Sequence, residues 1–415
     1  MTLLDLAYIP VAAAFLPSLL RKKRGGWRER FGHGDSLPEA TRPRVLLHAV
    51  SVGEVNALRA LVPLLTSECE VVVSATTDTG LERARALYGS QTKVVRFPLD
   101  TSDAVRRFVD RLKPDVVALT ELEVWPQFMR ECARRRVPVG VINGRLSERS
   151  FRGYRKIRFF MDEFFGGLSW AAVQNEEYAA RFVEMGVARE KCTITGSMKW
   201  DAISLLNPGQ IDAAAEQLAA ELGVDRKRPL VVAGSTGPGE EALMHRSVPE
   251  GVQLLCAPRK TERFDEAAAA LPRCVRRAAK LTGASGSSRF LLDTIGELRL
   301  AYMLADVVVV GRSFFDLFGS DPIEPIALGK PVVIGPAVSD FAEIVREFEV
   351  AGGLCRADRE SLAGMIKRLL SDPVERAQLA TAGIAVIRRQ QGASARHAEL
   401  ILDVVKQTGK PRSVG

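Results

Sequence analysis

Acidic side chains stand at two points in the first half of the chain where a run of aliphatic residues gives way to a turn. Glu54 lies in HAVSVGEVNA, and Glu121 and Glu123 lie in TELEVWP beside Trp125. A carboxylate there could take the proton from a hydroxyl group, which is a poor nucleophile until a base acts on it. A carboxylate in the first turn of a helix is also a favourable cap, so both interpretations of Glu54 stay open.

Glycine and acidic residues mark two turns in the second half. GSTGPGEE begins at Gly234 and runs into a helical pattern, and such a turn presents backbone N–H groups to a phosphate. It lacks the lysine of a P-loop and does not match GxGxxG, which disfavours an NTPase or a dehydrogenase. In FGSDPIEPIALGKPVVIG, Glu324 could bind the ribose hydroxyls of a nucleotide or could cap a helix.

Parallel β-strands are the elements that must position these residues. Short runs rich in Val and Ile alternate with helical patterns, which is typical of strands buried on both faces by crossover helices. The expected strands are residues 44–50, 70–75, 93–97, 115–120, 138–142, 171–174, 192–195, 229–233, 252–256, 289–292, 306–310 and 331–334. The pattern occurs twice, so we predict an α/β protein of two Rossmann-like, doubly wound domains.

The domain boundaries follow from composition. A chain of 415 residues exceeds one ordinary core, and the helix-breaking cluster at Asn207-Pro208-Gly209 separates the two α/β patterns. We expect a first domain at residues 25–207 and a second at 208–415. The pattern of residues 358–406 predicts helices that pack around the second domain. An alternative is that this segment crosses back to the first domain.

Cysteine, histidine and aspartate spacing disfavours a metal centre. The six cysteines lie far apart without a CxxC pair, which indicates a reducing compartment. The four histidines are scattered, and no two aspartates form DxD. We therefore expect neither a metal nor a cofactor.

Positive charge is clustered within a formal net charge of +8. Six of the ten residues 21–30 are Lys or Arg, and they follow an apolar run at residues 3–20. This order predicts a membrane anchor at residues 1–24 with its positive end in the cytoplasm. The alternatives are a helix that lies in the membrane interface and a helix that packs on the protein's own core. A cleaved signal peptide is disfavoured. A second basic cluster spans residues 145–158, where the aromatics of FRGYRKIRFF are spaced for a helix packed on the core and not for RNA, so no nucleic-acid partner is expected.

The segments together resemble the bacterial 3-deoxy-D-manno-octulosonic acid (Kdo) transferases over nearly the whole chain. The resemblance is carried by GGWRERFG, HAVSVGE, TELEVWP, INGRLSERS, TGSMKWD, GSTGPGEE, APRKTERF, DTIGELRLAY, ADVVVVG and DPIEPIALGKPVVIGP. It implies a GT-B glycosyltransferase that transfers Kdo from CMP-Kdo to a lipid A precursor with inversion. It also implies a nucleotide-sugar donor, an anionic membrane surface as partner, and a place at the cytoplasmic face of the bacterial inner membrane.

Residue roles follow from the same resemblance. It implies that Glu54 is the catalytic base and that Glu121 supports it. The residues expected on the donor side are Lys199, Gly234, Ser235, Thr236, Arg259 and Glu324. The residues expected to contact the acceptor are Ser51, Gly53, Arg145 and Arg149. The cations suit a donor with a carboxylate and a phosphate, and an acceptor that bears phosphates.

The sequence departs from the family pattern in the second domain. The family reads GSTHxGEE, PRHxERF and GGHNPLEP, whereas Gly237, Lys260 and Ser320 stand here at the histidine positions and Asp321 replaces asparagine. The alternatives are a related transferase or epimerase with another nucleotide-sugar donor, or a membrane-binding homologue that has lost catalysis.

Overall fold

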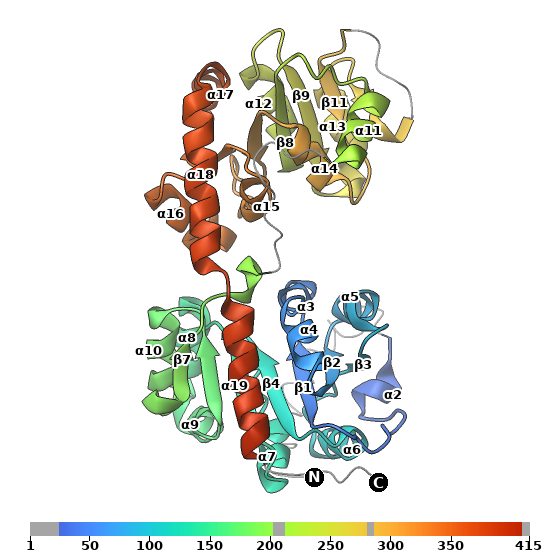
Figure 1. Cartoon of the computed structure of the whole chain (residues 1–415), viewed down its shortest axis with the longest axis vertical. Helices are drawn as coiled ribbons and strands as arrows, with labels where there is room; N and C mark the ends of the chain where they lie inside the picture. The colour runs from blue at the N-terminus through green and yellow to red at the C-terminus, as the bar shows by residue number, and fades with distance from the viewer. Residues whose placement is uncertain (1–24, 202–211, 280–285, 409–415) are drawn as a thin grey trace. The chain divides into compact units, whose positions relative to one another are not determined.

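The protein forms two compact units. The computed structural model describes residues 25–201, 212–279 and 286–408 (Figure 1). The first unit holds the described residues up to Asp201 and those from Gln390 onward, and the second holds those between. The last helix therefore belongs with the first unit, whereas the sequence-based boundaries placed all of residues 208–415 in the second domain. The expected seam at residue 207 and the expected anchor at residues 1–24 lie outside the described residues.

A seven-stranded parallel sheet forms the centre of the first unit, in the order β3-β2-β1-β4-β5-β6-β7. Its strands are β1 (Arg44–Ala49), β2 (Glu70–Ala75), β3 (Lys93–Arg96), β4 (Val116–Thr120), β5 (Val139–Gly144), β6 (Trp170–Val173) and β7 (Cys192–Ile194). Strands β1, β2, β4, β5 and β6 are buried almost throughout, because helices cover both faces of the sheet.

Helices of the first unit fall on the two faces of this sheet. Apolar side chains of α6 (Ser102–Leu112), α7 (Pro126–Arg134), α9 (Arg158–Gly166) and α10 (Glu176–Glu184) form one core with it. Side chains of α3 (Val52–Ala57), α4 (Leu61–Thr66), α5 (Asp78–Tyr88) and the C-terminal α19 (Ala393–Gln407) form the other. The remaining helices are α2 (Trp27–Arg30) and α8 (Glu148–Lys156). The C-terminal helix thus completes a face that the crossovers leave partly open.

The second unit repeats the arrangement with the strand order β10-β11-β9-β8-β12-β13-β14. Its strands are β8 (Leu230–Thr236), β9 (Gln253–Pro258), β10 (Val275–Arg276), β11 (Arg289–Leu291), β12 (Val307–Val310), β13 (Val332–Ile334) and β14 (Cys355–Arg356). Its helices are α11 (Ala213–Leu222), α12 (Glu240–Ser247), α13 (Phe264–Ala270), α14 (Leu298–Leu304), α15 (Ile323–Ala327), α16 (Ala342–Val350), α17 (Leu362–Ser371) and α18 (Pro373–Gln390). Side chains of α12, α13 and α17 share one core with the sheet. Helix α11 packs on α14, and α14 in turn packs on β8.

The two parallel sheets confirm the predicted α/β, doubly wound fold. The two-residue edge strands β10 and β14 were not predicted. All six cysteines are unpaired. Within the described ranges, no helix is long and apolar enough to cross a membrane.

Candidate active site

Residues in the left-handed backbone region lie at the carboxyl ends of central strands in both units. Glu121 has φ 63° after β4 and Asn143 has φ 50° near the end of β5. In the second unit Ser235 has φ 57° and Arg312, just after β12, has φ 58°. Non-glycine residues persist in this region only where the surroundings hold them, and such strain gathers at ligand sites. Open α/β sheets bind ligands at this edge, so each unit is expected to hold a ligand site there.

Glu54 lies in the first turn of α3, just after β1. Its Oε2 accepts the Val50 N–H at 2.8 Å, and its Oε1 accepts the Ser51 hydroxyl at 2.8 Å. The carboxylate therefore fixes the turn, as a cap does, while it remains half-exposed. Burial raises the pKa of Glu54, the bonds from Val50 and Ser51 oppose this, and the charge of Glu121 raises the pKa further. The Glu54 side chain thus caps the turn and at the same time has a raised pKa.

Two more carboxylates share this neighbourhood. Burial and the charge of Glu54 raise the pKa of Glu123 to about 7, although a 2.9 Å bond from Trp125 Nε1 to its Oε2 opposes the shift. Glu121 is half-buried, and its Oε1 lies 3.9 Å from Lys199 Nζ. The carboxylates are electrostatically coupled, so protonation of one changes the proton affinity of its neighbours.

A pocket of about 360 Å³ opens beside these carboxylates. Its lining residues are Glu121, Leu122, Glu123, Arg145, Ser147, Ser150 and Tyr154. Arg145 brings a guanidinium to the pocket and reaches Tyr178 Oη from Nε at 3.4 Å. Arg149, on α8, is exposed and does not line the pocket. Ser51 contacts Glu54, and the neighbouring Gly53 is exposed. The pocket thus offers carboxylates, hydroxyls and one guanidinium to a polar ligand.

The C-terminal helix reaches this site through a buried polar network that the sequence did not reveal. His397 Nε2 accepts the Asn143 N–H at 3.3 Å and lies 3.1 Å from Thr195 Oγ1. Asn143 Oδ1 in turn accepts the Met198 N–H at 3.0 Å, next to Lys199. Burial, and then the charge of the neighbouring arginine, lower the pKa of His397 to about 3, so its ring stays neutral and Nε2 can accept. The network links α19 to the end of β5 and to the segment that carries Lys199.

Asp201 joins the same helix at its start. Its Oδ1 accepts the Gly392 N–H at 2.6 Å, and its Oδ2 accepts the Ser394 N–H. The carboxylate thereby satisfies N–H groups at the amino end of α19. The last acid of TGSMKWD is thus an anchor for a helix about 190 residues away in the chain.

In the second unit, the glycine-rich turn after β8 is held by two buried glutamates. Glu240 accepts the N–H groups of Gly237 at 2.8 Å, Arg312 at 2.6 Å, Ser313 at 2.9 Å and Phe314 at 3.0 Å. Glu241 accepts the Thr236 hydroxyl at 2.6 Å and pairs with Arg263. The expectation that this turn presents free N–H groups is therefore met only in part, because Glu240 takes up the N–H of Gly237. Its three other donors lie in the loop after β12, which Glu240 ties to this turn. In the sequence these glutamates only mark the start of a helical pattern, and their burial in the structure shows this role.

Ser235 and Glu324 meet around a buried tyrosine. An alanine Cβ at Gly234 would lie 2.0 Å from Tyr302 Oη, so this position requires glycine. Tyr302 also interacts with the Ser235 side chain, and burial followed by the charge of Glu324 raises the pKa of its hydroxyl. Burial raises the pKa of Glu324 as well, while Arg299, 3.9 Å away, lowers it.

Arg259 and the departures from the family pattern border this cluster. Arg259 is exposed, and its N–H donates to Thr236 O at 3.0 Å. Asp321 Oδ1 accepts the Ile323 N–H at 2.9 Å, so this carboxylate caps the start of α15. Ser320 is buried, and its Oγ has no hydrogen-bond partner within the described part of the chain. Lys260 is exposed.

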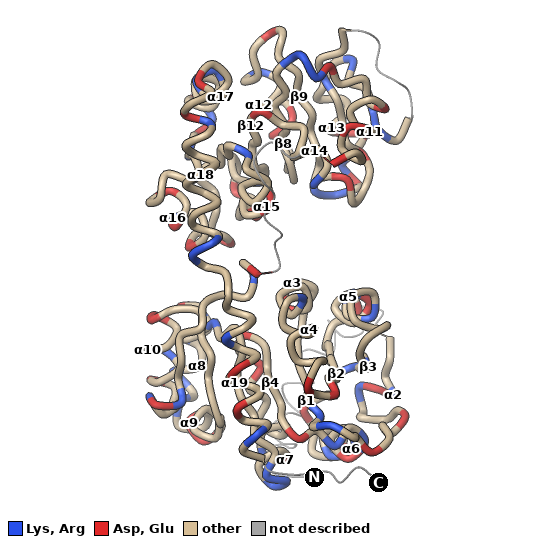
Figure 2. The backbone as a smooth tube through the Cα atoms, viewed as in Figure 1, with Lys and Arg blue, Asp and Glu red and all other residues tan. Residues whose placement is uncertain are grey.

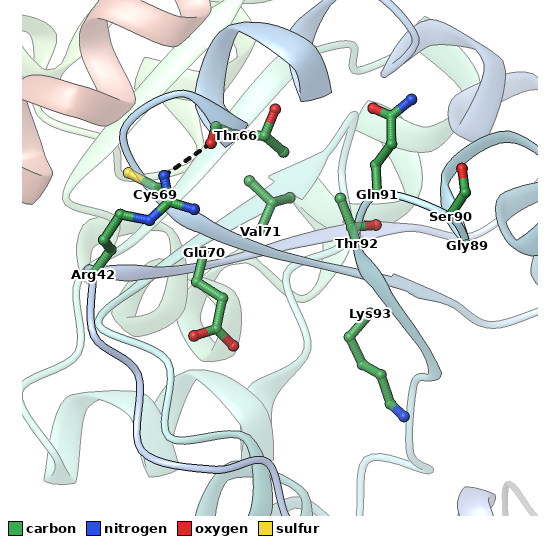
Figure 3. Close-up of a pocket in the computed structure, with 10 residues that line it drawn as sticks. All are labelled: Arg42, Thr66, Cys69, Glu70, Val71, Gly89, Ser90, Gln91, Thr92 and Lys93. Carbon is green, nitrogen blue, oxygen red and sulfur yellow. Dashed lines mark hydrogen bonds between the residues drawn. The ribbon is translucent and has the colours of Figure 1, made fainter.

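A second pocket of about 360 Å³ lies at the opposite edge of the first sheet (Figure 3). It is lined by residues at the amino ends of β2 and β3, among them Glu70 and Lys93. Arg42 there donates to Thr66 O at 3.1 Å. None of the predicted site residues lines it. Over the described ranges, no group of three or more His, Cys, Asp or Glu side chains could hold a metal ion.

Comparison with known proteins identifies the class and then the family. Residues 25–202 match the family described as 3-deoxy-D-manno-octulosonic-acid transferase, and residues 272–386 match glycosyl transferases group 1. The Anabaena protein HepE in complex with UDP has a similar fold, with a TM-score of 0.60 at 13% identity over 88% of this chain and 100% of that one. The UDP-GlcNAc 2-epimerase from Neisseria meningitidis gives a TM-score of 0.58 at 12% identity, over 87% of this chain and 100% of the epimerase chain. These structures show the fold alone, and with the family matches they define a GT-B-like glycosyltransferase.

The relatives in sequence are more specific. A 3-deoxy-D-manno-octulosonic acid transferase from Bordetella pertussis is 32% identical over 92% of this chain and 94% of its own length. One from Haemophilus influenzae is 30% identical over 91% of this chain and 90% of its own length. The chain belongs to the Kdo transferase family, as the sequence motifs predicted.

Proposed function

We propose that the protein is an inverting transferase that moves Kdo from CMP-Kdo to a lipid A precursor in lipopolysaccharide synthesis. An acceptor hydroxyl oxygen attacks the anomeric carbon of Kdo. The bond from this carbon to the phosphate oxygen breaks, and CMP leaves with the bonding electron pair. Glu54 takes the acceptor proton. Glu121 supports it because the negative charge of Glu121 raises the proton affinity of Glu54.

The geometry of Glu54 is the observation that carries this proposal. Its two oxygens are fixed by Val50 and Ser51, and its pKa is raised by burial and by Glu121. A fixed carboxylate with a raised proton affinity is a better general base than one free in water, provided that it is ionised at the working pH.

In this proposal, basic side chains bind the acidic groups of the donor and of the acceptor. We assign Lys199 and Arg259 to the phosphate or carboxylate of CMP-Kdo, and Arg145 and Arg149 to the acceptor, with Ser51 and Gly53 beside it. Glu324 and the Gly234-Ser235-Thr236 turn face the nucleotide. Thr236 contributes through its backbone position, because its hydroxyl already donates to Glu241.

Location follows from the acceptor. We propose that residues 25–207 bind the acceptor and that the domain after residue 208 binds the nucleotide. Residues 1–24 would hold the enzyme at the cytoplasmic face of the bacterial inner membrane, where the basic cluster at residues 21–30 meets anionic lipid.

Calorimetric titration of the full-length protein with CMP and UMP tests the donor assignment. We expect CMP to bind at least about tenfold more tightly than UMP, and Glu324→Ala to weaken CMP by at least about tenfold because a carboxylate bond to ribose is lost. Asp321→Asn keeps the cap on Ile323 and removes a negative charge near Glu324, so CMP should bind equally well or more tightly. Glu360→Ala, an exposed change in the same unit, serves as the control. A preference for UMP, or unchanged CMP binding in Glu324→Ala, contradicts the assignment.

A further inference from the structure

The loop between β12 and α15 holds an aromatic side chain in a strained backbone conformation. Phe318 has a φ of 69° and is 57% exposed. Among the described non-glycine residues with a left-handed backbone, it is the only aromatic one. A bulky residue with this φ costs stability that a glycine would not, and such strain gathers at ligand sites. Phe318 is not among the residues that the family resemblance assigns to the donor.

Hydrogen bonds on both sides of Phe318 hold the loop in this conformation. Phe318 O accepts the Asp340 N–H at 3.1 Å, and the next residue, Gly319, donates its N–H to Arg312 O at 2.8 Å. Gly319 has a φ of 86°, and a Cβ there would lie 3.0 Å from Val338 Cα. The loop is therefore closed against its own start and against the segment after β13, and the ring is held out toward solvent.

The same loop is joined to the glycine-rich turn after β8. Glu240 accepts three N–H groups from the start of the loop and one from the turn. Leu317, next to Phe318, packs directly on the turn, since a Cβ at Gly237 would collide with its side chain. Phe318 therefore belongs to the carboxyl edge of the second sheet, where open α/β sheets bind ligands.

The position of Phe318 along this edge indicates which part of a ligand it meets. The sheet order places β12 between β8 and β13. The residues that we assign to the nucleotide lie on the β8 side, because Arg259 follows β9 and Glu324 faces α14, where Arg299 lies 3.9 Å away. Phe318 lies on the β13 side, through its bond to Asp340. A nucleotide sugar along this edge would extend its sugar toward Phe318.

The neighbours of Phe318 suit an uncharged part of a ligand. Residues 313–320 contain one charged side chain, Asp316, in Figure 2, where charged residues are blue or red. Ser320 is buried, and its Oγ has no hydrogen-bond partner within the described part of the chain. A buried hydroxyl in this state calls for a bound group as its partner. The loop thus offers an aromatic face and a nearby hydroxyl.

We propose that Phe318 is a specificity-determining residue that packs its ring on the C–H face of the donor sugar. The face of an aromatic ring carries partial negative charge, so it favours C–H groups and disfavours a carboxylate. The ring would therefore orient an acidic sugar with its carboxylate turned toward the basic side chains, and Ser320 would bond to a sugar hydroxyl. That the sugar is Kdo rests on the proposed function, whereas the contact with a nucleotide sugar does not.

Substitutions at Phe318 in the full-length protein test the ring contact. Phe318→Ala removes the ring and keeps a Cβ, Phe318→Gly removes both, and Phe318→Tyr keeps the ring. We expect Phe318→Ala and Phe318→Gly to raise KM for CMP-Kdo roughly three- to tenfold. The KM for the lipid acceptor and the affinity for free CMP, measured by calorimetry, should not change, and Phe318→Tyr should resemble wild type.

A comparison of the two small variants separates the ring from the backbone strain. Glycine adopts the left-handed φ without cost and alanine does not, so Phe318→Gly should unfold about 2–4 °C above Phe318→Ala. Arg273→Gly is the matched control, because Arg273 has a φ of 55° at the amino end of β10, at the opposite edge of the sheet. It should keep the wild-type KM values.

Three results would overturn the proposal. If Phe318→Ala keeps the wild-type KM for CMP-Kdo while Phe318→Gly raises it, the loop conformation matters and the ring does not. A change in KM for the acceptor alone would place the ring against the acceptor. An equal loss of affinity for free CMP would place it against the nucleotide.

A binding measurement distinguishes failure of this inference from failure of the proposed function. If the wild-type protein transfers no Kdo, the proposed function fails, and the ring contact is decided by calorimetric titration with CMP-linked and UDP-linked sugars and the free nucleotides. We then expect one nucleotide sugar to bind more tightly than its free nucleotide, with the difference lost in Phe318→Ala. A set in which no sugar adds affinity, or in which the added affinity survives in Phe318→Ala, overturns the inference.

Discussion

The carboxyl groups of Glu54, Glu121 and Glu123 share one neighbourhood, so each proton bound there affects the others. Burial and the charges of the other two raise the pKa of Glu123 to about 7. At pH 6 Glu123 is mostly neutral, and Glu54 then has one negative neighbour fewer. As the pH rises through 7, Glu123 ionises, and its new charge increases the proton affinity of Glu54. Under the proposed function, Glu123 would therefore tune the proton affinity of Glu54.

Glu123→Gln should remove a pH dependence of stability. A carboxyl whose folded pKa is raised holds its proton more tightly in the folded state, so its contribution is greatest at low pH and is lost as the pH rises from the unfolded value toward about 7. Glutamine keeps an oxygen for Trp125 Nε1 and cannot ionise. We expect the variant to gain on the order of 1–2 kcal/mol over wild type between pH 5 and pH 8, measured by urea unfolding. The acid limb of its transfer rate should also move to lower pH, because Glu54 loses a negative neighbour. A difference in stability that is constant across this range would contradict the raised pKa.

Side chains of the C-terminal helix α19 contact the strand ends. Arg396 Nε donates to Thr195 O, just after β7, at 2.8 Å. His397 accepts the N–H of Asn143, which holds a left-handed φ of 50°, and Asn143 positions the backbone next to Lys199. Asp201 fixes the start of the same helix. Figure 1 shows α19, in red, running alongside the strands of the first unit. We interpret His397 as a positioning residue, since it is buried and neutral and lies behind the site.

Variants of His397 should separate positioning from bulk packing. In His397→Leu the buried Asn143 N–H loses its acceptor, which should cost about 1–3 kcal/mol of stability and lower kcat. In His397→Gln an amide oxygen can accept the same N–H, so we expect kcat to recover to within a few-fold of wild type. Urea unfolding and transfer kinetics on both variants measure this. Equal kcat in the two variants, with both folded, would show that the acceptor atom does not matter.

At the scale of the whole molecule, the alternation of aliphatic runs with helical patterns predicts both sheets. The strand β2 begins and ends where the pattern does, since its side chains are buried on both faces. The strand β8 runs three residues past its expected end at Ala233, because Ser235 turns left-handed and the register with β9 shifts between Gly234 and Thr236. The edge strands β10 and β14 have two residues each, too few to carry any periodicity.

The candidate site could be predicted best where its residues follow a strand closely. Glu121 comes directly after β4 and Glu54 lies in the helix turn after β1, and the strand ends bring the two together. Glu324 instead opens α15 after a loop, so its prediction came from the loop-to-helix motif that contains it. The partnership of Asp201 and His397 with the site could not be predicted, because it joins positions about 190 to 250 residues apart in the chain. The role of Glu240 was hidden for another reason. A carboxylate that opens a helix resembles a cap in sequence, and only its burial shows that it binds the loop after β12.

The turnover of Glu54→Gln tests the central claim most directly. Glutamine can keep the Val50 N–H on its oxygen and let Ser51 Oγ accept from its amide, so the turn should survive while the base is lost. With CMP-Kdo and a tetra-acyl lipid A precursor, we expect kcat to fall by roughly two to four orders of magnitude. Unfolding temperature and CMP affinity should stay close to wild type. Glu176→Gln, which alters an exposed first-turn glutamate on α10, should keep normal turnover. Near-normal turnover of a folded Glu54→Gln protein would contradict the account.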